Sequence, residues 1–171
     1  MKHPVENVEW IDAMTLKGNG WNPNAVLMPE LKILERSILD LGWVQPILIN
    51  KSLIIIDGFH RWRLAIDSNP IRRRDGGLVP CCVLDVPDYK AMILTIRMNR
   101  AKGTHVAARM SSVIKKLINE YKLDPVQVAE EIRADKTEID ILLQDGIFRA
   151  RNLGNYRYGR AWVPTDDGRR S

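Results

Sequence analysis

The spacing of apolar residues along the N-terminal part of the chain predicts strands and helices. An extended segment at 7–17 offers Val8, Trp10 and Ile11 to a sheet. A helix is then expected to begin at Pro29 and to end at Gly42. Within it, apolar side chains recur every three or four positions, which is the spacing of one buried helical face. The residues of that face are Leu31, Leu34, Ile38 and Leu41.

Two short apolar runs follow, and both are rich in the β-branched residues that favour strands. The polar residues between them fit a tight hairpin. Farther along, a run of arginines and glycines predicts a loop between a helix and a strand. The expected elements are strands at 44–49 and 53–56 with a hairpin at 50–52, a helix at 60–67, a loop at 70–77, a strand at 79–86 and a helix at 88–98.

Beyond Gly103 the pattern is that of helices alone. Apolar residues from Val106 to Tyr121 can share one helical face. Asp124 and Pro125 together form the start signal of a short helix, because the first caps it and the second needs no N–H there. Another short helix is expected at 137–143, so this pair resembles a helix-turn-helix.

These patterns predict an α+β protein in three parts. A small mixed β-sheet with packed helices is expected at 1–103, and a helical, helix-turn-helix-like subdomain at 104–147. A basic tail at 148–171 contains few core-forming residues, and we expect it to be loosely ordered.

Composition excludes several classes of protein. Hydrophobic residues make up 45% and charged residues 27% of the 171 residues, as in an ordinary globular protein. No apolar run approaches the roughly 20 residues of a membrane span, and the N-terminus lacks the apolar core of a secretion signal. We therefore expect a cytoplasmic protein without membrane contact, in a bacterial or phage-infected cell. Cys81 and Cys82 are adjacent, which excludes a disulfide framework and predicts two buried thiols.

The net charge of +5 is unevenly distributed along the chain. The segments 57–103 and 146–171 each carry a net charge of +4, which favours phosphate-bearing partners, nucleotides or nucleic acid, although a solvated basic surface is the plain alternative. The predicted DNA contacts are Arg72, Arg73 and Arg74 in the expected loop, and Lys136 and Thr137 at the start of the second short helix. Next to these, Glu138 and Asp140 would face phosphates unfavourably.

The most informative segment is a predicted strand that runs through Asp57 and Gly58 into a helix beginning with His60 and Arg61. Backbone N–H groups at a helix N-terminus have no partner within the helix, and the helix dipole adds to their attraction for anions. Glycine lets the backbone approach a phosphate closely. The segment therefore predicts an anion site, and the alternative is a capped helix with exposed arginines.

This segment, Asp57 to Ala65, resembles the Gly-x-x-Arg-Trp-Arg-x-Ala box of the ParB/sulfiredoxin superfamily. The region 31–49 is similar to the helix and Gly-x-x-Gln-Pro-Ile strand of ParB N-terminal domains, and 98–102 to their Glu-Asn-x-x-Arg motif. Residues 110–143 resemble the helix-turn-helix region that follows in ParB proteins. The overall resemblance, over about 7–145, is to small stand-alone ParB-like proteins of phages and mobile elements.

The resemblance implies a nucleoside triphosphate, CTP or ATP, bound with Mg²⁺. Residues carried over for nucleotide binding are Gly58, His60, Arg61 and Arg63 at the phosphates, Gln45 with Pro46 at the pocket wall, Asn99 on the side of the nucleotide's Mg²⁺, and Lys102 in place of the motif's final Arg. Met98 stands where the family has a Glu linked to CTP hydrolysis, and a thioether neither binds Mg²⁺ well nor acts as a base. Phe59 stands where sulfiredoxins have their catalytic Cys. Neither ParB-type hydrolysis nor peroxiredoxin repair is therefore expected.

The predicted function is that of a ParB-like nucleotide-binding protein acting on or near DNA, in partition, regulation or phage biology. Nucleotide and DNA are the expected partners, and a homodimer is an option because ParB relatives dimerise. One alternative is a phosphotransferase of the serine-kinase type, which needs a carboxylate base. Its candidates are Asp57 and Glu30, with Glu35 also available. A ParB-like nuclease and a pure interaction module are further alternatives.

Overall fold

A computed structural model of the chain describes residues 3–19, 28–101 and 107–143. Its sheet has four strands in the order β1-β4-β2-β3. β1 (Val8–Asp12) pairs antiparallel with β4 (Leu78–Leu84), β4 pairs parallel with β2 (Ile47–Asn50), and β2 pairs antiparallel with β3 (Ile55–Asp57). The mixed sheet predicted from the sequence is therefore confirmed.

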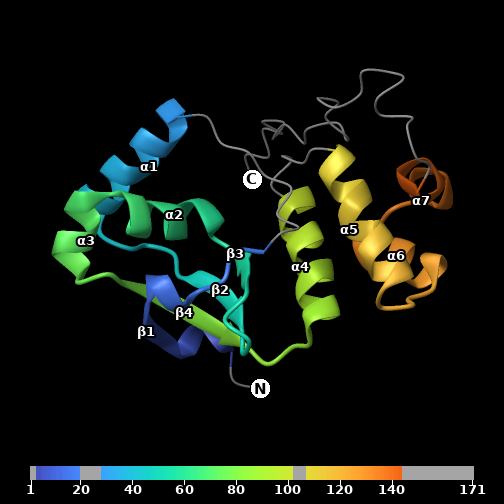
Figure 1. The fold of residues 1–171 in the computed structure, drawn as a ribbon, viewed down its shortest axis with the longest axis horizontal. Coiled ribbons are helices and arrows are strands. Elements are labelled where there is room, and N and C mark those ends of the chain that lie inside the picture. The colour runs from blue at the N-terminus through green and yellow to red at the C-terminus, as the bar shows by residue number, and fades with distance from the viewer. Residues whose placement is uncertain (1–2, 20–27, 102–106, 144–171) are drawn as a thin grey trace, which may run out of the picture.

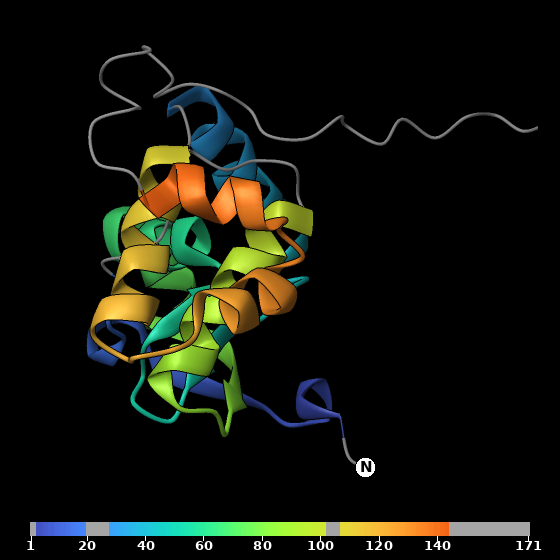
Figure 2. The ribbon, with the colours of Figure 1, turned by 90° about the vertical axis from the view of Figure 1, so that its right-hand side faces the viewer.

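Helices cover one face of this sheet and extend beyond one of its edges (Figure 1). α2 packs on the sheet, with α1 and α3 outside it. α4 lies along the β3 edge and separates the sheet from α5, α6 and α7, which face the viewer in Figure 2. The helices are α1 (Met28–Leu41), α2 (Phe59–Asp67), α3 (Asn69–Asp75), α4 (Asp88–Ala101), α5 (Ala107–Asn119), α6 (Pro125–Ile132) and α7 (Lys136–Leu143).

The buried apolar side chains form two main clusters, one on each side of α4. The first lies between the sheet and α2, and the second lies among α4, α5, α6 and α7. Burial at fully enclosed positions removes apolar surface from water and is the main force holding each cluster together. The first cluster includes Ile47, Ile49, Ile55, Ala65, Val79 and Cys81, and the second includes Met92, Ile96, Met110, Ile114, Leu117, Val128, Ile132, Ile139 and Leu142.

The two cysteines lie on β4 and are buried, as predicted. Burial raises the pKa of the Cys81 thiol to about 12, and it also raises the pKa of Cys82. Both side chains are therefore protonated at neutral pH and act as packing residues in the sheet.

The loop predicted at 70–77 is wrong, because most of this segment forms α3. Ser68 caps the helix by accepting a hydrogen bond from the backbone N–H of Ile71, whose side chain is buried. Pro70 occupies the first turn, where its missing N–H has no cost, and Gly76 ends the helix at a φ of +63°.

Two other predictions near α1 need correction. Leu41 is 77% exposed at the last position of α1 and does not join the buried face. The strand expected from Val44 begins only at Ile47, since Pro46 has no N–H to give to the sheet and Val44 is exposed. Among the described residues no helix is long and apolar enough to cross a membrane.

Candidate functional site

The candidate site lies where β3 ends and α2 begins. Gly58 joins them with a φ of +92°, a left-handed conformation that L residues rarely adopt. A Cβ at Gly58 would lie 2.9 Å from Nη2 of Arg61 and 3.3 Å from the Cα of Ile47. Gly58 has no side chain to cap α2, so the backbone N–H groups of the first turn remain suited to an anion.

Distant side chains fix the backbone of β3 beneath this turn. Asn19, which is buried, donates a hydrogen bond from Nδ2 to the carbonyl of Ile55. Thr95 on α4 donates from Oγ1 to the carbonyl of Ile56 at 3.1 Å. Neither residue is among those predicted from the sequence, because neither contact leaves a local pattern there. They hold the strand on which the site is built.

Arg61 is the central side chain of the site and is only 14% exposed. Its Nη2 lies 3.5 Å from Oδ2 of Asp57, and its Nη1 donates a hydrogen bond to Oε1 of Gln45. Its Nε is buried and makes no hydrogen bond within the described part of the chain. Burial lowers the pKa of Arg61, which the charge of Asp57 partly opposes. The structure thus brings together three predicted site residues.

His60 and Arg63 lie on the outer side of α2, where they line a groove shared with α1. Arg63 forms an ion pair with Asp67 at 2.7 Å, and both side chains are about half exposed. Charged side chains of both signs and apolar side chains line the groove together. The groove has a volume of about 420 Å³ and is lined by Leu31, Lys32, Glu35, Phe59, His60, Arg63, Leu64, Asp67 and Ser68.

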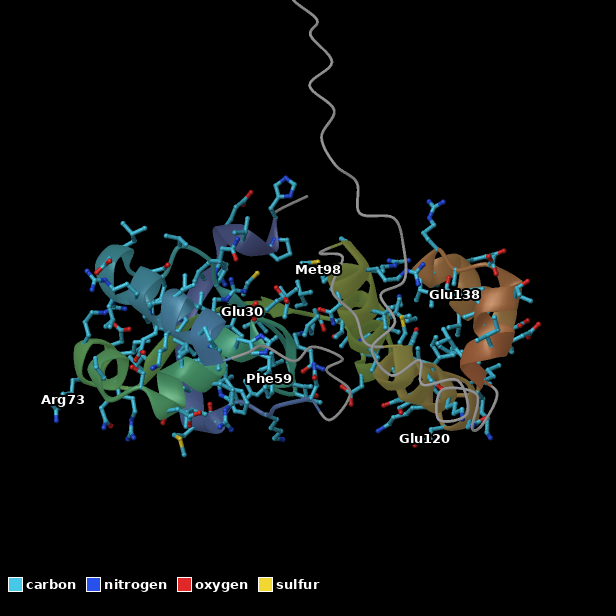
Figure 3. All side chains as sticks on the ribbon, turned by 90° about the horizontal axis from the view of Figure 1, so that it is seen from above. Glu30, Phe59, Arg73, Met98, Glu120 and Glu138 are labelled. Atoms are coloured by element: carbon cyan, nitrogen blue, oxygen red, sulfur yellow. The ribbon has the colours of Figure 1, made fainter. Side chains whose placement is uncertain are left out.

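The remaining predicted site residues lie on α1 and α4. Glu30 is exposed in the first turn of α1, and Asn99 is buried on α4 one turn after Thr95. Figure 3 places Glu30, Phe59 and Met98 in the central part of the molecule. Lys102 lies outside the described residues. Across the described ranges, no group of three or more His, Cys, Asp or Glu side chains is arranged to hold a metal ion.

The predicted DNA contacts do not form one cluster. Arg72 and Arg73 are exposed on α3, whereas Arg74 pairs with Asp75 and donates to the carbonyl of Ile38. α7 lies at the other end of the molecule, as the positions of Arg73 and Glu138 in Figure 3 show. Thr137 is exposed at the start of α7, and the side chain of Lys136 lies outside the described residues.

Two arginines of α4 hold the helix-turn-helix-like pair α6 and α7. Arg97 donates to the backbone carbonyl of Glu131 and pairs with its carboxylate. Arg100 pairs with Glu138 at 2.6 Å and also donates to the carbonyl of Arg133 at 3.3 Å. Glu138 was expected to face DNA phosphates unfavourably if α7 read DNA, and the structure shows that its carboxylate, only 15% exposed, is already paired with Arg100.

The chain is similar in sequence to two curated proteins, although no protein-family model matches it. It is 32% identical over 167 residues to the uncharacterized protein YbdM of Escherichia coli, covering 95% of this chain and 78% of YbdM. It is also 32% identical over 136 residues to the probable chromosome-partitioning protein ParB of Vibrio cholerae. That match covers 75% of this chain but only 44% of the Vibrio protein.

Solved structures of ParB proteins show a distant likeness. C-terminally truncated ParB of Caulobacter crescentus with CTP-γ-S matches 80% of this chain and 76% of that chain, with a TM-score of 0.45 and 20% identity. A Pnob8-like ParB-N domain matches 86% and 64%, with a TM-score of 0.48 and 15% identity. The identity and coverage of the match to YbdM show that this chain belongs to the same family as YbdM, and part of its sequence is also similar to the Vibrio cholerae ParB protein.

Proposed function

We propose that this ParB-like protein binds the phosphates of a nucleoside triphosphate, CTP or ATP with Mg²⁺, at the junction of β3 and α2. The observation that carries the proposal is the glycine turn at Gly58, where a Cβ would meet Arg61 and the backbone of Ile47. Such a turn combines close backbone approach with the positive end of a helix dipole. The buried guanidinium of Arg61 adds a fixed positive charge beside it.

In this proposal each residue of the site has a separate role. Phosphate oxygens accept hydrogen bonds from the backbone N–H groups of the first turn of α2 and from His60, Arg61 and Arg63. Gln45 holds Arg61 in place through its hydrogen bond to Nη1. The amide of Asn99 contributes on the side of the Mg²⁺ that the phosphates bring with them.

We assign Asp57 a positioning role. Its carboxylate lies 3.5 Å from Nη2 of Arg61, and both side chains are largely buried. An arriving phosphate would take over one face of the Arg61 guanidinium, while Asp57 keeps that group beside Gly58.

A DNA-associated role is the second part of the proposal. The Vibrio cholerae relative is a probable chromosome-partitioning protein, and the match to it covers 75% of this chain. Arg72 and Arg73 are exposed cations suited to phosphate contacts. Binding of duplex DNA that weakens steeply as salt rises would support this role, and binding independent of salt would contradict it.

Calorimetric titration tests the nucleotide site. CTP, ATP, GTP and ADP are titrated with Mg²⁺ into the protein and its Arg61→Ala variant. Loss of a charged hydrogen-bond donor is expected to lower the affinity for the tightest-binding nucleotide at least about tenfold. Arg36→Ala is the matched control, because Arg36 is exposed on α1 and pairs only with Asp40 among the described residues.

A loss of nucleotide binding is informative only in a variant that still folds. Since Arg61→Ala removes the contacts that the guanidinium makes with Asp57 and Gln45, circular dichroism checks its fold, and His60→Ala provides a second variant with an intact interior. Unchanged affinity in both variants would remove the assigned site. No binding of any nucleotide to the native chain would remove the proposed function.

A further inference from the structure

The outer edge of β1 is open for pairing. β1 and β3 are the two end strands of the sheet, and no described strand pairs with the outer edge of β1. This edge is separate from the proposed nucleotide site, which lies at the end of β3 (Figure 1). An unpaired strand edge presents a row of backbone N–H and C=O groups to which another strand can bind.

The pairing with β4 shows which backbone groups of β1 face outward. In an antiparallel pair, residues that exchange two hydrogen bonds alternate with residues that exchange none. Trp10 lies opposite Pro80, which has no N–H to give. Three positions on, the N–H of Ala13 donates to the carbonyl of Gly77 at 3.0 Å. The N–H and C=O groups of Val8 and Trp10 therefore point away from β4, where they make no hydrogen bond with any described residue.

The same two residues expose apolar surface on the face of the sheet opposite α2. Ile11 packs in the cluster beneath α2, and successive strand residues point to opposite faces, so Val8 and Trp10 lie on the other face. Trp10 is 54% exposed and Val8 is 39% exposed. Leu78 on β4 shares their face and is 40% exposed. An accessible tryptophan among smaller apolar residues is typical of the anchors of protein interfaces.

The charge along this edge indicates the kind of partner. The stretch 4–15 contains the acidic residues Glu6, Glu9 and Asp12 and no basic residue, although the whole chain has a net charge of +5. All three side chains are exposed, and none forms an ion pair with a described residue. Their charge repels nucleic acid and attracts a polypeptide that carries lysine or arginine. Charges on an edge strand often only prevent aggregation, but an exposed tryptophan is not part of such protection.

We propose that β1 is a docking edge for an extended, basic segment of another protein, which adds a fifth strand to the sheet. The backbone of that segment exchanges hydrogen bonds with Val8 and Trp10. Its side chains alternate between the two faces. Those on one face are apolar and cover Trp10, and those on the other face are basic and lie beside Glu9. This interaction does not depend on nucleotide binding.

Amide hydrogen exchange with a synthetic peptide tests the edge directly. The probe has about eight residues, in which arginine alternates with valine. In the native chain alone, the amides of Val8 and Trp10 should exchange fast, whereas those of Glu9 and Ile11 are protected by β4. Saturating peptide should slow exchange at Val8 and Trp10 at least about tenfold, because only these two amides gain hydrogen bonds.

Two variants test the side chains that the proposal uses. Trp10→Ala should weaken the peptide at least about tenfold, and the charge reversal Glu9→Lys at least about threefold. Val44→Ala is the matched control, because Val44 is another exposed apolar residue and lies outside the strands. It should bind the peptide as the native chain does. Melting temperatures verify that each variant folds, and Glu9→Lys changes only an exposed side chain.

Two altered peptides separate strand addition from charge attraction. N-methylation of alternate residues removes the donors of one peptide edge and keeps the charge, and glutamate in place of arginine reverses the charge. Neither peptide should bind, and binding of either as tightly as the probe would overturn the proposal. A probe that leaves exchange at Val8 and Trp10 unchanged would also overturn it.

Two other occupants of the edge give different results. Slow exchange of Val8 and Trp10 without peptide would show that the edge is already occupied, by a second copy if the chain sediments as a dimer. Protection of these amides by duplex DNA would assign the edge to nucleic acid. Either result would overturn the proposal, which predicts fast exchange in the free chain and no protection by DNA.

Discussion

At the scale of single residues, Gly58 is the position of the proposed phosphate site at which a substitution should be tolerated least. Two independent costs would follow from a side chain there, one from its φ of +92° and one from its close contacts with Arg61 and Ile47. Gly42 offers a natural comparison, because it has a φ of +80° but nothing lies within 4 Å of where its Cβ would be.

Gly58→Ala is therefore expected to destabilise the protein more than Gly42→Ala. The left-handed conformation alone costs roughly 1–2 kcal/mol for an L residue, and this cost applies to both variants. The crowding at Gly58 should add to it and should also displace Arg61, so tripolyphosphate binding should weaken in this variant only. Urea unfolding measures the first effect and calorimetry the second. Equal destabilisation with unchanged anion binding would contradict the account.

At the scale of elements, Asp75 joins the end of α3 to the segment after α1. Its carboxylate accepts a hydrogen bond from Nε1 of Trp43 at 2.7 Å and two from Arg74, also at 2.7 Å. These interactions lower the pKa of Asp75, chiefly through the hydrogen bond with Arg74. The side chain is only 11% exposed, so solvent screens these interactions weakly.

The lowered pKa gives this contact a defined pH dependence. In acid, Asp75 takes up a proton more readily in the unfolded chain than in the folded chain. The contact therefore stabilises the fold above the usual aspartate pKa of about 4. That contribution is lost as pH falls through the lowered pKa. Asp75→Asn is expected to cost about 1–2 kcal/mol at pH 7, and the difference should shrink towards pH 2. Unfolding curves across this pH range measure it, with exposed Asp40→Asn as control, and a difference that grows in acid would refute the assignment.

The helices, α3 among them, show what the sequence could and could not predict. Periodicity and caps predicted α1, α2, α4, α6 and α7 close to their observed positions, because each has a local start or stop signal. α3 was missed because its arginines and following glycines are typical of loops. Its cap at Ser68 and the proline after it were present as signals, but the burial of Ile71 that completes the helix is a tertiary effect.

The candidate site likewise has one part that the sequence could predict and one part that it could not. The turn at Gly58 and its neighbours His60 and Arg61 are contiguous in sequence, so a local motif could predict them. Asn19 and Thr95 reach the carbonyls of β3 from 36 and 39 positions away. Contacts of that kind arise only when the chain has folded, and one sequence carries no pattern for them.

At the scale of the whole molecule, the two sets of predicted DNA contacts lie at opposite ends (Figure 3). The double variant Arg72→Ala, Arg73→Ala and the single variant Thr137→Ala therefore test separate surfaces. If α3 contacts DNA phosphates, the double variant should weaken duplex binding and reduce its dependence on salt. Each phosphate contact contributes about one unit to the slope of the logarithm of the binding constant against the logarithm of the salt concentration. Thr137→Ala should leave that slope unchanged. Fluorescence anisotropy at graded salt measures both, and a slope unchanged by the double variant would remove α3 from the DNA surface.

α4 connects the two halves of the molecule through different faces. Thr95 bonds to the carbonyl of Ile56 beneath the candidate site, while Arg97 and Arg100 hold α6 and α7. A ligand that favours one position of α4 would therefore shift the equilibrium between alternative arrangements of α5, α6 and α7. This connection gives the proposed nucleotide site a physical route to the proposed DNA surface.

The central claim is that nucleotide phosphates bind at the start of α2. The most direct measurement is the change in backbone amide chemical shifts of the isotopically labelled chain on addition of CTP with Mg²⁺. The account predicts that the largest shifts occur at 58–61 and that tripolyphosphate alone reproduces them. Largest shifts in α5, α6 or α7, or no shifts at saturating nucleotide, would contradict it.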